Sequence, residues 1–205
     1  TAPTELLWAG SNTLYATFTD NTVSKITLAA ANTAPTITSG ATASLNENAA
    51  TSTVVYTTTA TDAESDTLTY ALTGTDAASF TIDTAGAVRL VSPADYETKS
   101  SYSITVNAKD ASNTTTKAVT INVTDVNEAP TNIALSASSV AENTSTASAL
   151  NIGNLTSTDP DTGNTFTYSV VGGADQASFQ VTGAALQFKA GATLDYETKN
   201  SYAVT

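Results

Sequence analysis

Two parts of this chain of 205 residues carry the same short motifs in the same order, and this repeat limits the possible folds more than any other feature. One motif is identical in both copies, because Asp95-Tyr96-Glu97-Thr98-Lys99 returns as Asp195-Tyr196-Glu197-Thr198-Lys199. The other pairs are Ala34-Pro35-Thr36 with Ala129-Pro130-Thr131, Leu45-Asn46-Glu47-Asn48 with Val140-Ala141-Glu142-Asn143, Ala60-Thr61-Asp62-Ala63-Glu64 with Ser157-Thr158-Asp159-Pro160-Asp161, Leu68-Thr69-Tyr70 with Phe166-Thr167-Tyr168, and Asp76-Ala77-Ala78-Ser79-Phe80 with Asp175-Gln176-Ala177-Ser178-Phe179. The repeat predicts two copies of one folded unit, at residues 34–128 and 129–205.

Within the first copy, short segments rich in β-branched and aromatic residues are separated by turn-forming residues, which is the pattern of a β-sandwich. We expect strands at residues 41–45, 53–61, 67–73, 79–83, 87–91, 101–109 and 115–125. Alternate residues of the last two strands, such as Ile104 and Val119, would share one core. The predicted fold class is all-β, with seven strands in a complete unit. The second copy follows the same course as far as Thr205, so its last strand and a half are missing.

Residues 1–33 are expected to form a β-meander that is too small to bury a core alone, with strands at residues 5–9, 13–19 and 23–30. When Pro35 is aligned with Pro130, Ile26 falls over Ile121, Leu28 over Val123 and Asn32 over Asn127, while Leu14, Ala16, Phe18 and Asp20 match Ile104, Val106, Ala108 and Asp110. The meander thus resembles the hairpin that the second copy lacks. Two interpretations stay open: a donor hairpin that completes a neighbouring chain, and the remnant of a preceding unit in a longer array. Residues 201–205 already begin the strand that a donor would supply, and this overlap counts against the first interpretation.

The composition excludes several classes of function. The net charge of -12, from 7 basic and 19 acidic residues, repels nucleic acid and anionic lipid. Since the chain has no Cys, His or Met, thiol nucleophiles, imidazole bases, disulfides and the common zinc or copper ligands are unavailable. A carboxylate pair such as Asp95 with Glu97 could serve a glycosidase, but its presence in both copies is better explained by ligand binding, and we predict no enzyme. No apolar run approaches the roughly 20 residues of a membrane span.

Acidic residues recur at the motifs and at the edges of the units. In a sandwich, Glu47, Asp95 and Glu97 would gather at the end of the first unit nearest the linker, and Asp159 and Asp161 at the near end of the second. Asp125 and Asn127 lie in the linker between these ends. So many carboxylates would repel one another unless cations lay among them, and calcium, which accepts about six to eight oxygen ligands, is the natural candidate. A solvated polar hinge without metal is the alternative.

These motifs together resemble the cadherin repeat over about residues 34–205: a Glu after the first strand, an acidic pair Asp-x-Glu or Asp-x-Asp, the Asp-Tyr-Glu cluster, the Ala-x-Asp that ends in Asp110, and the linker Asp125-Val126-Asn127-Glu128-Ala129-Pro130. The resemblance implies tandem Greek-key, immunoglobulin-like sandwiches whose joints bind calcium and stiffen a rod. Carried over, the ligands of the central joint would be Glu47, Asp95, Glu97, Asp125, Asn127, Glu128, Asp159 and Asp161, with the Val126 carbonyl. Half sites would be formed by Asp62, Glu64 and Asp110, with Asp20 and Asn32 preceding them, and by Glu142, Asp195 and Glu197.

The expected function is that of an extracellular or cell-surface structural or adhesive module, stiffened by calcium. The Asn-Glu-Ala-Pro form of the linker is similar to repeats of large bacterial surface proteins, so a prokaryotic origin is expected. Partners would be neighbouring repeats or further copies of the chain, arranged head to tail and completed by strand exchange. The alternative is an adhesin module, excerpted from a longer array, that binds a glycan or a protein receptor through Trp8 or exposed Tyr residues. A hydrolase accessory domain is a third interpretation.

Overall fold

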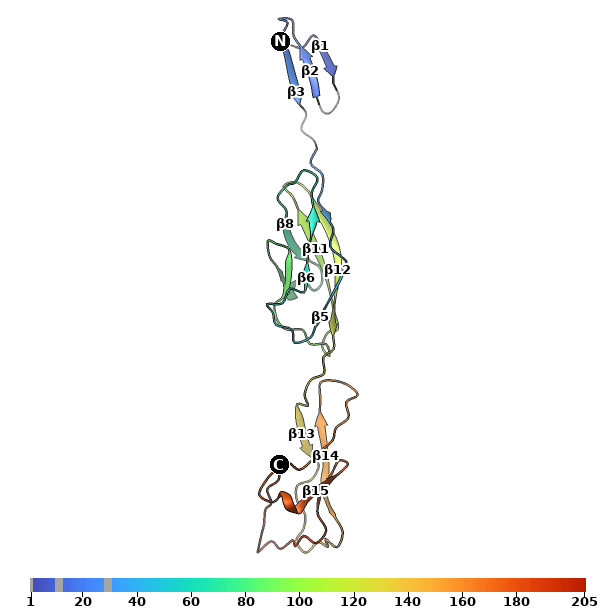
Figure 1. Cartoon of the computed structure of the whole chain (residues 1–205), viewed down its shortest axis with the longest axis vertical. Coiled ribbons are helices and arrows are strands. Elements are labelled where there is room, and N and C mark those ends of the chain that lie inside the picture. The colour runs from blue at the N-terminus through green and yellow to red at the C-terminus, as the bar shows by residue number, and fades with distance from the viewer. Residues whose placement is uncertain (1, 10–12, 28–30) are drawn as a thin grey trace. The chain divides into compact units, whose positions relative to one another are not determined.

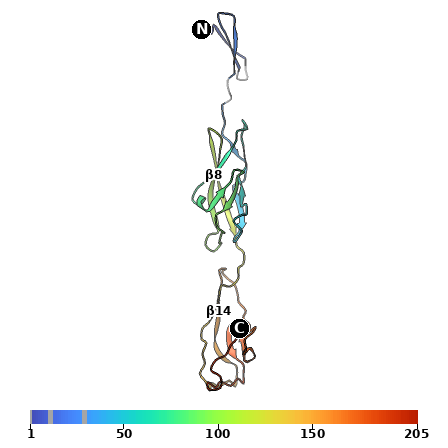
Figure 2. The same cartoon turned by 90° about the vertical axis from the view of Figure 1, so that its left-hand side faces the viewer.

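A computed structural model describes residues 2–9, 13–27 and 31–205 and divides into unit 1, Thr1–Asp125, and unit 2, Val126–Thr205 (Figures 1 and 2). Strands dominate both units, and the helical segments among the described residues are two short 3-10 turns, η1 (Ala77–Ser79) and η2 (Gln176–Ser178). The predicted all-β class and the predicted sandwich are confirmed. In the described part of the chain, no helix has the length and apolar character that crossing a membrane requires.

The amino-terminal segment forms a three-stranded antiparallel sheet in the order β1 (Glu5–Trp8), β2 (Thr13–Thr17) and β3 (Val23–Thr27). Trp8 pairs with Leu14, and Leu14 pairs with Ile26, so these apolar side chains share one face. Trp8 remains 56% exposed and Ile26 43% exposed. The end of the strand predicted at residues 23–30 and the turn predicted at residues 10–12 lie outside the described residues.

The pairing within this segment differs from the sequence alignment by two residues. Leu14 pairs with Ile26, whereas its counterpart Ile104 pairs with Val119 rather than with Ile121. Leu14 therefore lies 12 positions from its partner in the sequence, whereas Ile104 lies 15 positions from Val119. Because the shift is an even number of residues, Ile26 stays on the face that the alignment gave it.

The first sandwich contains a four-stranded sheet in the order β5 (Thr42–Asn46), β12 (Thr114–Thr124), β11 (Ser101–Lys109) and β8 (Thr69–Thr73). A three-stranded sheet has the order β6 (Tyr56–Thr57), β10 (Ala87–Leu90) and β9 (Phe80–Ile82). A small pair joins β4 (Thr36–Ile37) to β7 (Ala60–Thr61). The strand β12 runs antiparallel to β11 but parallel to β5, so β5 and β12 end at the same edge of the sheet.

The core of this sandwich is built from alternate residues of its long strands. Ile104 and Val106 of β11 are buried beside Val119 and Ile121 of β12, as the alternation predicted. Val88 of the opposite sheet is completely buried against them. Outward-facing positions of β11 and β12 are mostly Ser, Thr and Asn, because one face of each strand meets water.

One predicted strand of the first unit is interrupted. Residues 53–61 form the separate strands β6 and β7, because Tyr56 and Thr57 pair with β10 whereas Ala60 and Thr61 pair with β4. The backbone N–H of Thr58 donates to the carbonyl of Gly86 at 2.8 Å and continues the first of these pairings by one step. Gly86 has a positive φ of 80°, and a Cβ at this position would lie 2.4 Å from the Thr58 carbonyl oxygen. The sequence analysis also missed the strand β4, which is only two residues long.

Unit 2 contains one four-stranded sheet in the order β13 (Asn132–Leu135), β14 (Leu150–Thr158), β16 (Ala185–Phe188) and β15 (Phe179–Thr182). Its core is formed by Phe179, Leu186, Phe188 and Leu194. The counterparts of β8 and β11, at residues 166–170 and 201–205, are not strands, in contrast to the prediction. In unit 1, β8 pairs with the segment Thr105–Lys109 of β11. Within unit 2, Thr205 is the counterpart of the first residue of that segment, and it exchanges hydrogen bonds with Gly172.

A hollow of about 550 Å³ in unit 2 lies between residues 138–140 and residues 201–205. These two segments are the counterparts of β5 and β11, and in the first sandwich the strand β12 lies between them. Apolar side chains, including Leu135, Phe179 and Phe188, line the hollow. The hollow therefore lies where a strand equivalent to β12 would pack.

Candidate metal site

Three carboxylates meet at one end of the first sandwich. Glu47, Glu97 and Asp125 each place a carboxylate oxygen within 4.8 Å of the others. Glu47 follows β5 and Asp125 follows β12, and these strands pair in parallel up to Asn46 and Thr124. The N–H of Glu47 donates to the Thr124 carbonyl at 3.1 Å, which continues the pairing one step further. Parallel pairing therefore explains why two residues far apart in sequence converge here.

Glu47 is held in place by the Asp-Tyr-Glu turn. Its carboxylate accepts the backbone N–H of Tyr96 at 2.8 Å, and the residue is only 3% exposed. The same contact occurs in unit 2, where Glu142 accepts the N–H of Tyr196 at 3.2 Å. The recurrence shows that the Glu after the first strand and the Asp-Tyr-Glu turn form one local structure.

Asp95 has a different position from its predicted partners. Its two carboxylate oxygens accept the N–H and the hydroxyl of Thr98, each at 2.9 Å, and it is not part of the three-carboxylate group. Asp95 thus shapes the turn that presents Glu97. In unit 2 the equivalent Asp195 also caps Thr198, at 3.1 and 2.8 Å. The Thr198 hydroxyl is the main cause of a lowered pKa of Asp195.

A second group in unit 2 contains Glu142, Asp195 and Glu197, whose carboxylate oxygens lie within 4.8 Å of one another. All three residues are exposed. The three residues correspond in sequence to Glu47, Asp95 and Glu97 of the first copy. Glu142, Asp195 and Glu197 are themselves the residues that were predicted to form a half site.

The linker residues of unit 2 contact its acidic pair. The N–H of Glu128 donates to Asp161 at 2.7 Å, and the amide of Asn127 donates to the Glu128 carbonyl at 2.8 Å. Asp159 accepts the N–H of Asp161 at 3.0 Å. The other carboxylate oxygen of Asp161 is buried and has no hydrogen-bond partner. A buried anionic oxygen without a partner is costly, and a cation would remove this cost, so the donor set fits calcium.

The opposite end of the first sandwich repeats this arrangement. The N–H and the hydroxyl of Thr33 donate to Glu64 at 3.2 and 2.8 Å, as Glu128 donates to Asp161, and they lower the pKa of Glu64. Asp62 has a buried carboxylate oxygen without a partner. The buried Asp110 accepts the Asn32 amide at 3.0 Å, and hydrogen bonds from the backbone around Asn113 are the main cause of its lowered pKa. Among the described residues, these carboxylates do not form a group of three as close as those above.

Asp20, the remaining predicted ligand, accepts the N–H and the hydroxyl of Thr22 at 3.0 and 2.6 Å. The Thr22 side chain lowers its pKa. No close group of three carboxylates that includes Asp20 occurs within residues 2–9, 13–27 and 31–205.

The sequence analysis missed two ion pairs, each formed by the Lys that follows an Asp-Tyr-Glu turn. Lys99 forms an ion pair with Asp76, and Lys199 forms the equivalent pair with Asp175. The signal was present in the sequence, because both the Asp and the Lys recur within motifs that are repeated in the two copies.

Comparison with protein families shows that residues 41–124 match the Cadherin domain. Comparison with curated protein sequences found no match. Similar solved structures include human Protocadherin-24 EC1-2, with a TM-score of 0.66, 22% identity and coverage of 82% of either chain. Drosophila N-cadherin EC1-4 has a TM-score of 0.60 and 25% identity, over 82% of this chain and 43% of the other. Mouse Cadherin-23 EC22-24 has a TM-score of 0.56 and 25% identity, over 88% of this chain and 63% of the other. The chain therefore has a cadherin-like β-sandwich fold.

Proposed function

We propose that this chain is an extracellular structural or adhesive module in which calcium binds at the joint between tandem sandwiches and stiffens it. The observation that carries the proposal is the close group of Glu47, Glu97 and Asp125 at the end of the first sandwich. In the proposal, Asn127, Glu128, Asp159, Asp161 and the Val126 carbonyl supply the remaining oxygen ligands.

Electrostatics favour a cation at this group. Two carboxylates about 4.8 Å apart repel each other by roughly 3 kcal/mol at the effective dielectric constant of a protein surface. Three such pairs therefore oppose folding unless a cation or protons neutralise them. Glu47 is buried and already held by Tyr96, so it cannot turn away into solvent without losing that hydrogen bond. Calcium accepts many oxygens in a flexible geometry, whereas magnesium demands a tight octahedron.

Thermal unfolding in calcium and in chelator tests this proposal. A ligand that binds only the folded chain stabilises it by about 2.7 kcal/mol at 100 times its Kd, so calcium is expected to raise Tm well above the value in chelator. Magnesium at the same concentration serves as the control and is expected to raise Tm less. An unchanged Tm across the calcium series would refute the metal site.

The hydrogen bonds of Asp95 support a structural rather than a catalytic function. Both oxygens of Asp95 accept hydrogen bonds from Thr98, so the Asp95 and Glu97 pair lacks the free acid and base that a glycosidase needs. The proposed location is a cell surface, which the cadherin-like fold supports, and the Asn-Glu-Ala-Pro linker is the reason for proposing a prokaryotic one. A glycan array separates this function from glycan recognition, which Trp8 or exposed Tyr residues would have to provide.

Self-association is a second proposal, favoured by two uncovered apolar surfaces. The sheet β1–β3 exposes Leu6, Trp8 and Ile26 on one face, and unit 2 has its hollow where a strand like β12 belongs. A second copy of the chain would insert β3 between residues 138–140 and 201–205, and the contact would repeat head to tail. One consequence opposes this insertion. The strand β2 would enter beside β3 and would have to displace residues 203–205, because β2 and residues 203–205 both correspond to β11.

Deletion of residues 1–31 tests this second proposal. The full chain is expected to form higher oligomers as its concentration rises, and the deletion variant is expected to sediment as a monomer at every concentration. The substitution Ile26→Asp in the full chain should have the same effect, because a charge would enter an apolar hollow. A monomeric full chain, or oligomers that persist after the deletion, would exclude completion by β3.

A further inference from the structure

Lys99 directly follows the turn that carries the candidate metal ligand Glu97, and its side chain is held by two contacts. Its ammonium nitrogen lies 2.5 Å from a carboxylate oxygen of Asp76 and 5.0 Å from the centre of the Tyr102 ring. The other Asp76 oxygen accepts the N–H of Ser103 at 2.7 Å, and the N–H of Asp76 donates to the Ser103 carbonyl at 3.2 Å. Asp76 is thus fixed to β11 by its backbone and by its side chain.

Unit 2 contains the same set of contacts. Lys199 pairs with Asp175 and lies 4.9 Å from the centre of the Tyr202 ring. Asp175 accepts the N–H of Ala203 at 2.8 Å and donates its own N–H to the Ala203 carbonyl at 3.0 Å. Residues 201–205 are not a regular strand, so this arrangement forms even where the counterpart of β11 lacks regular strand pairing.

The ion pair is connected to the carboxylate group through a short chain of contacts. The N–H of Lys99 donates to the Asp95 carbonyl at 2.9 Å, and Thr98 donates to the Asp95 side chain. These bonds close the turn around Glu97, while the Tyr96 N–H in the same turn holds Glu47. Fixing Lys99 to Asp76 therefore fixes the segment from which two of the three carboxylates take their positions.

We propose that Lys99 and Asp76 are positioning residues for calcium binding, and that Lys199 and Asp175 have this function in unit 2. The inference rests on the calcium-binding function proposed above. Three carboxylates repel one another when no cation is bound, and a turn free to move would let Glu97 swing away into solvent. The ion pair keeps the turn in its binding geometry.

The Asp76 environment agrees with this function. The Asp76 side chain is only 12% exposed, against 40% for Lys99, so the pair is partly shielded from solvent. The Lys99 ammonium, the Ser103 N–H and the charge of Lys99 together lower the pKa of Asp76. The ionised form of Asp76, which the ion pair requires, is therefore favoured by the contacts that hold it.

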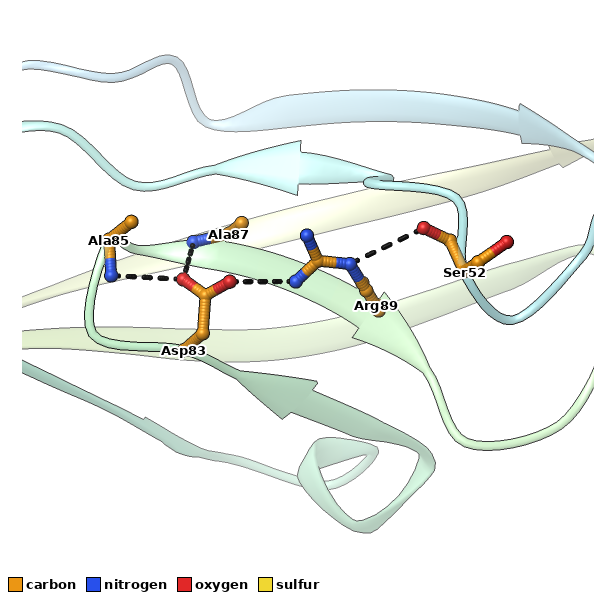
Figure 3. Close-up of polar contacts among 5 residues, drawn as sticks. All are labelled: Ser52, Asp83, Ala85, Ala87 and Arg89. Atoms are coloured by element: carbon orange, nitrogen blue, oxygen red, sulfur yellow. Dashed lines mark hydrogen bonds and ion pairs between the residues drawn. The ribbon is translucent and has the colours of Figure 1, made fainter.

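The chain offers a matched control pair. Arg89 lies 2.8 Å from Asp83 within the β9–β10 hairpin, and it also donates to the Ser52 carbonyl at 3.3 Å (Figure 3). Asp83 accepts the N–H groups of Ala85 and Ala87 as well, as Figure 3 shows. This pair lies in the same sandwich, and the Arg89 side chain is 32% exposed. No hydrogen bond described for it leads to the turn at residues 95–99.

Calcium titration of the full chain, by calorimetry and by terbium luminescence, tests the proposal. Loss of a group that orients a metal ligand lowers metal affinity by about 10-fold or more, so Lys99→Met is expected to weaken calcium binding by about 10-fold. Lys99→Arg, which retains the charge, is expected to bind within about threefold of the original chain, and Arg89→Met should bind as the original does. All titrations are run well below the Tm measured in chelator, so that every variant is folded.

Three results would overturn the inference. Lys99→Met could bind calcium as the original chain does, Arg89→Met could weaken binding as much, or Lys99→Arg could fail to restore it. If Lys99→Met does not fold, Lys199→Met asks the same question of the group in unit 2, and unchanged binding there would overturn the inference equally. A chain that binds no calcium before any substitution refutes the proposed function itself, which is a separate and recognisable result.

Discussion

The buried carboxylate of Glu47 accepts the backbone N–H of Tyr96 at 2.8 Å, although 49 positions separate the two residues in the sequence. This hydrogen bond joins the end of β5 to the turn that carries Asp95 and Glu97. It gives Glu47 a fixed orientation before any cation arrives. A ligand that is already oriented does not lose side-chain freedom on binding, so the affinity for the cation is higher.

The first prediction separates two roles of Glu47, which accepts the Tyr96 N–H and is a proposed ligand of the cation. Glu47→Gln keeps an acceptor for Tyr96 and removes one negative charge, so it should leave Tm in chelator unchanged or higher and abolish most of the calcium-dependent rise. Glu47→Ala removes the acceptor too and should cost about 1–3 kcal/mol in chelator, because the Tyr96 N–H loses its partner. Thermal unfolding with and without calcium measures both effects. Equal calcium-dependent rises in Glu47→Gln and the original chain would contradict this view.

The second prediction concerns Asp95, which caps the turn instead of joining the carboxylate group. Asp95→Asn keeps an acceptor for Thr98 and should reduce calcium affinity only slightly. Glu97→Gln removes a charge from the group itself and should reduce the affinity by about 10-fold or more. Calorimetric titration of the two variants compares them directly. A larger loss in Asp95→Asn than in Glu97→Gln would mean that Asp95 binds the cation.

The third prediction concerns pH. Asp76, Asp83 and Asp175 all have a pKa below the ordinary value of 3.8, because Lys99, Arg89 and Lys199 donate hydrogen bonds to them. A lowered pKa in the folded chain contributes stability that is present above the unfolded value of about 3.9 and is lost as the pH falls through the folded value. In chelator, Tm should therefore fall below about pH 4. The fall should be smaller in Lys99→Met, and an identical fall would show that the Asp76 pair contributes nothing.

The fourth prediction concerns the core of the first sandwich. Ile121 is completely buried between the sheets, so Ile121→Ala should lower the free energy of unfolding by about 2–5 kcal/mol. Its neighbour Thr120 is exposed, and Thr120→Ala should change the free energy by only about 0.5 kcal/mol. Urea unfolding in chelator measures both without any contribution from a cation. Comparable losses in the two variants would contradict the assigned faces of β12.

Local sequence was sufficient for the all-β class and for the faces of the long strands. The alternation of Ile104 and Val106 with polar residues predicted β11 at residues 101–109, and the structure has this strand at the same bounds. Side chains of a strand alternate between two faces, so a single apolar face can be recognised without knowing its neighbours. The repeat extended this prediction to the second copy.

Long-range pairing decided the details of the acidic group. The resemblance to the cadherin repeat implied that Asp95 is a ligand together with Glu97, and this stays a prediction. Only the fold shows that both Asp95 oxygens accept hydrogen bonds from Thr98. Glu47 and Asp125 meet because β5 and β12 pair in parallel, a relationship that no local pattern encodes. Such pairings depend on which strands become neighbours, and that is set by the packing of the whole sandwich.

The sequence by itself therefore determined that the chain repeats, that it folds into strands and that its acidic residues recur at equivalent positions. Only the tertiary structure decided which of these carboxylates share a site, where the strand predicted at residues 53–61 breaks, and that residues 166–170 and 201–205 of unit 2 form no ladder. The physical reason is the same in each case. A strand and a ligand group both exist through partners distant in the chain, so their presence depends on contacts and not on local composition.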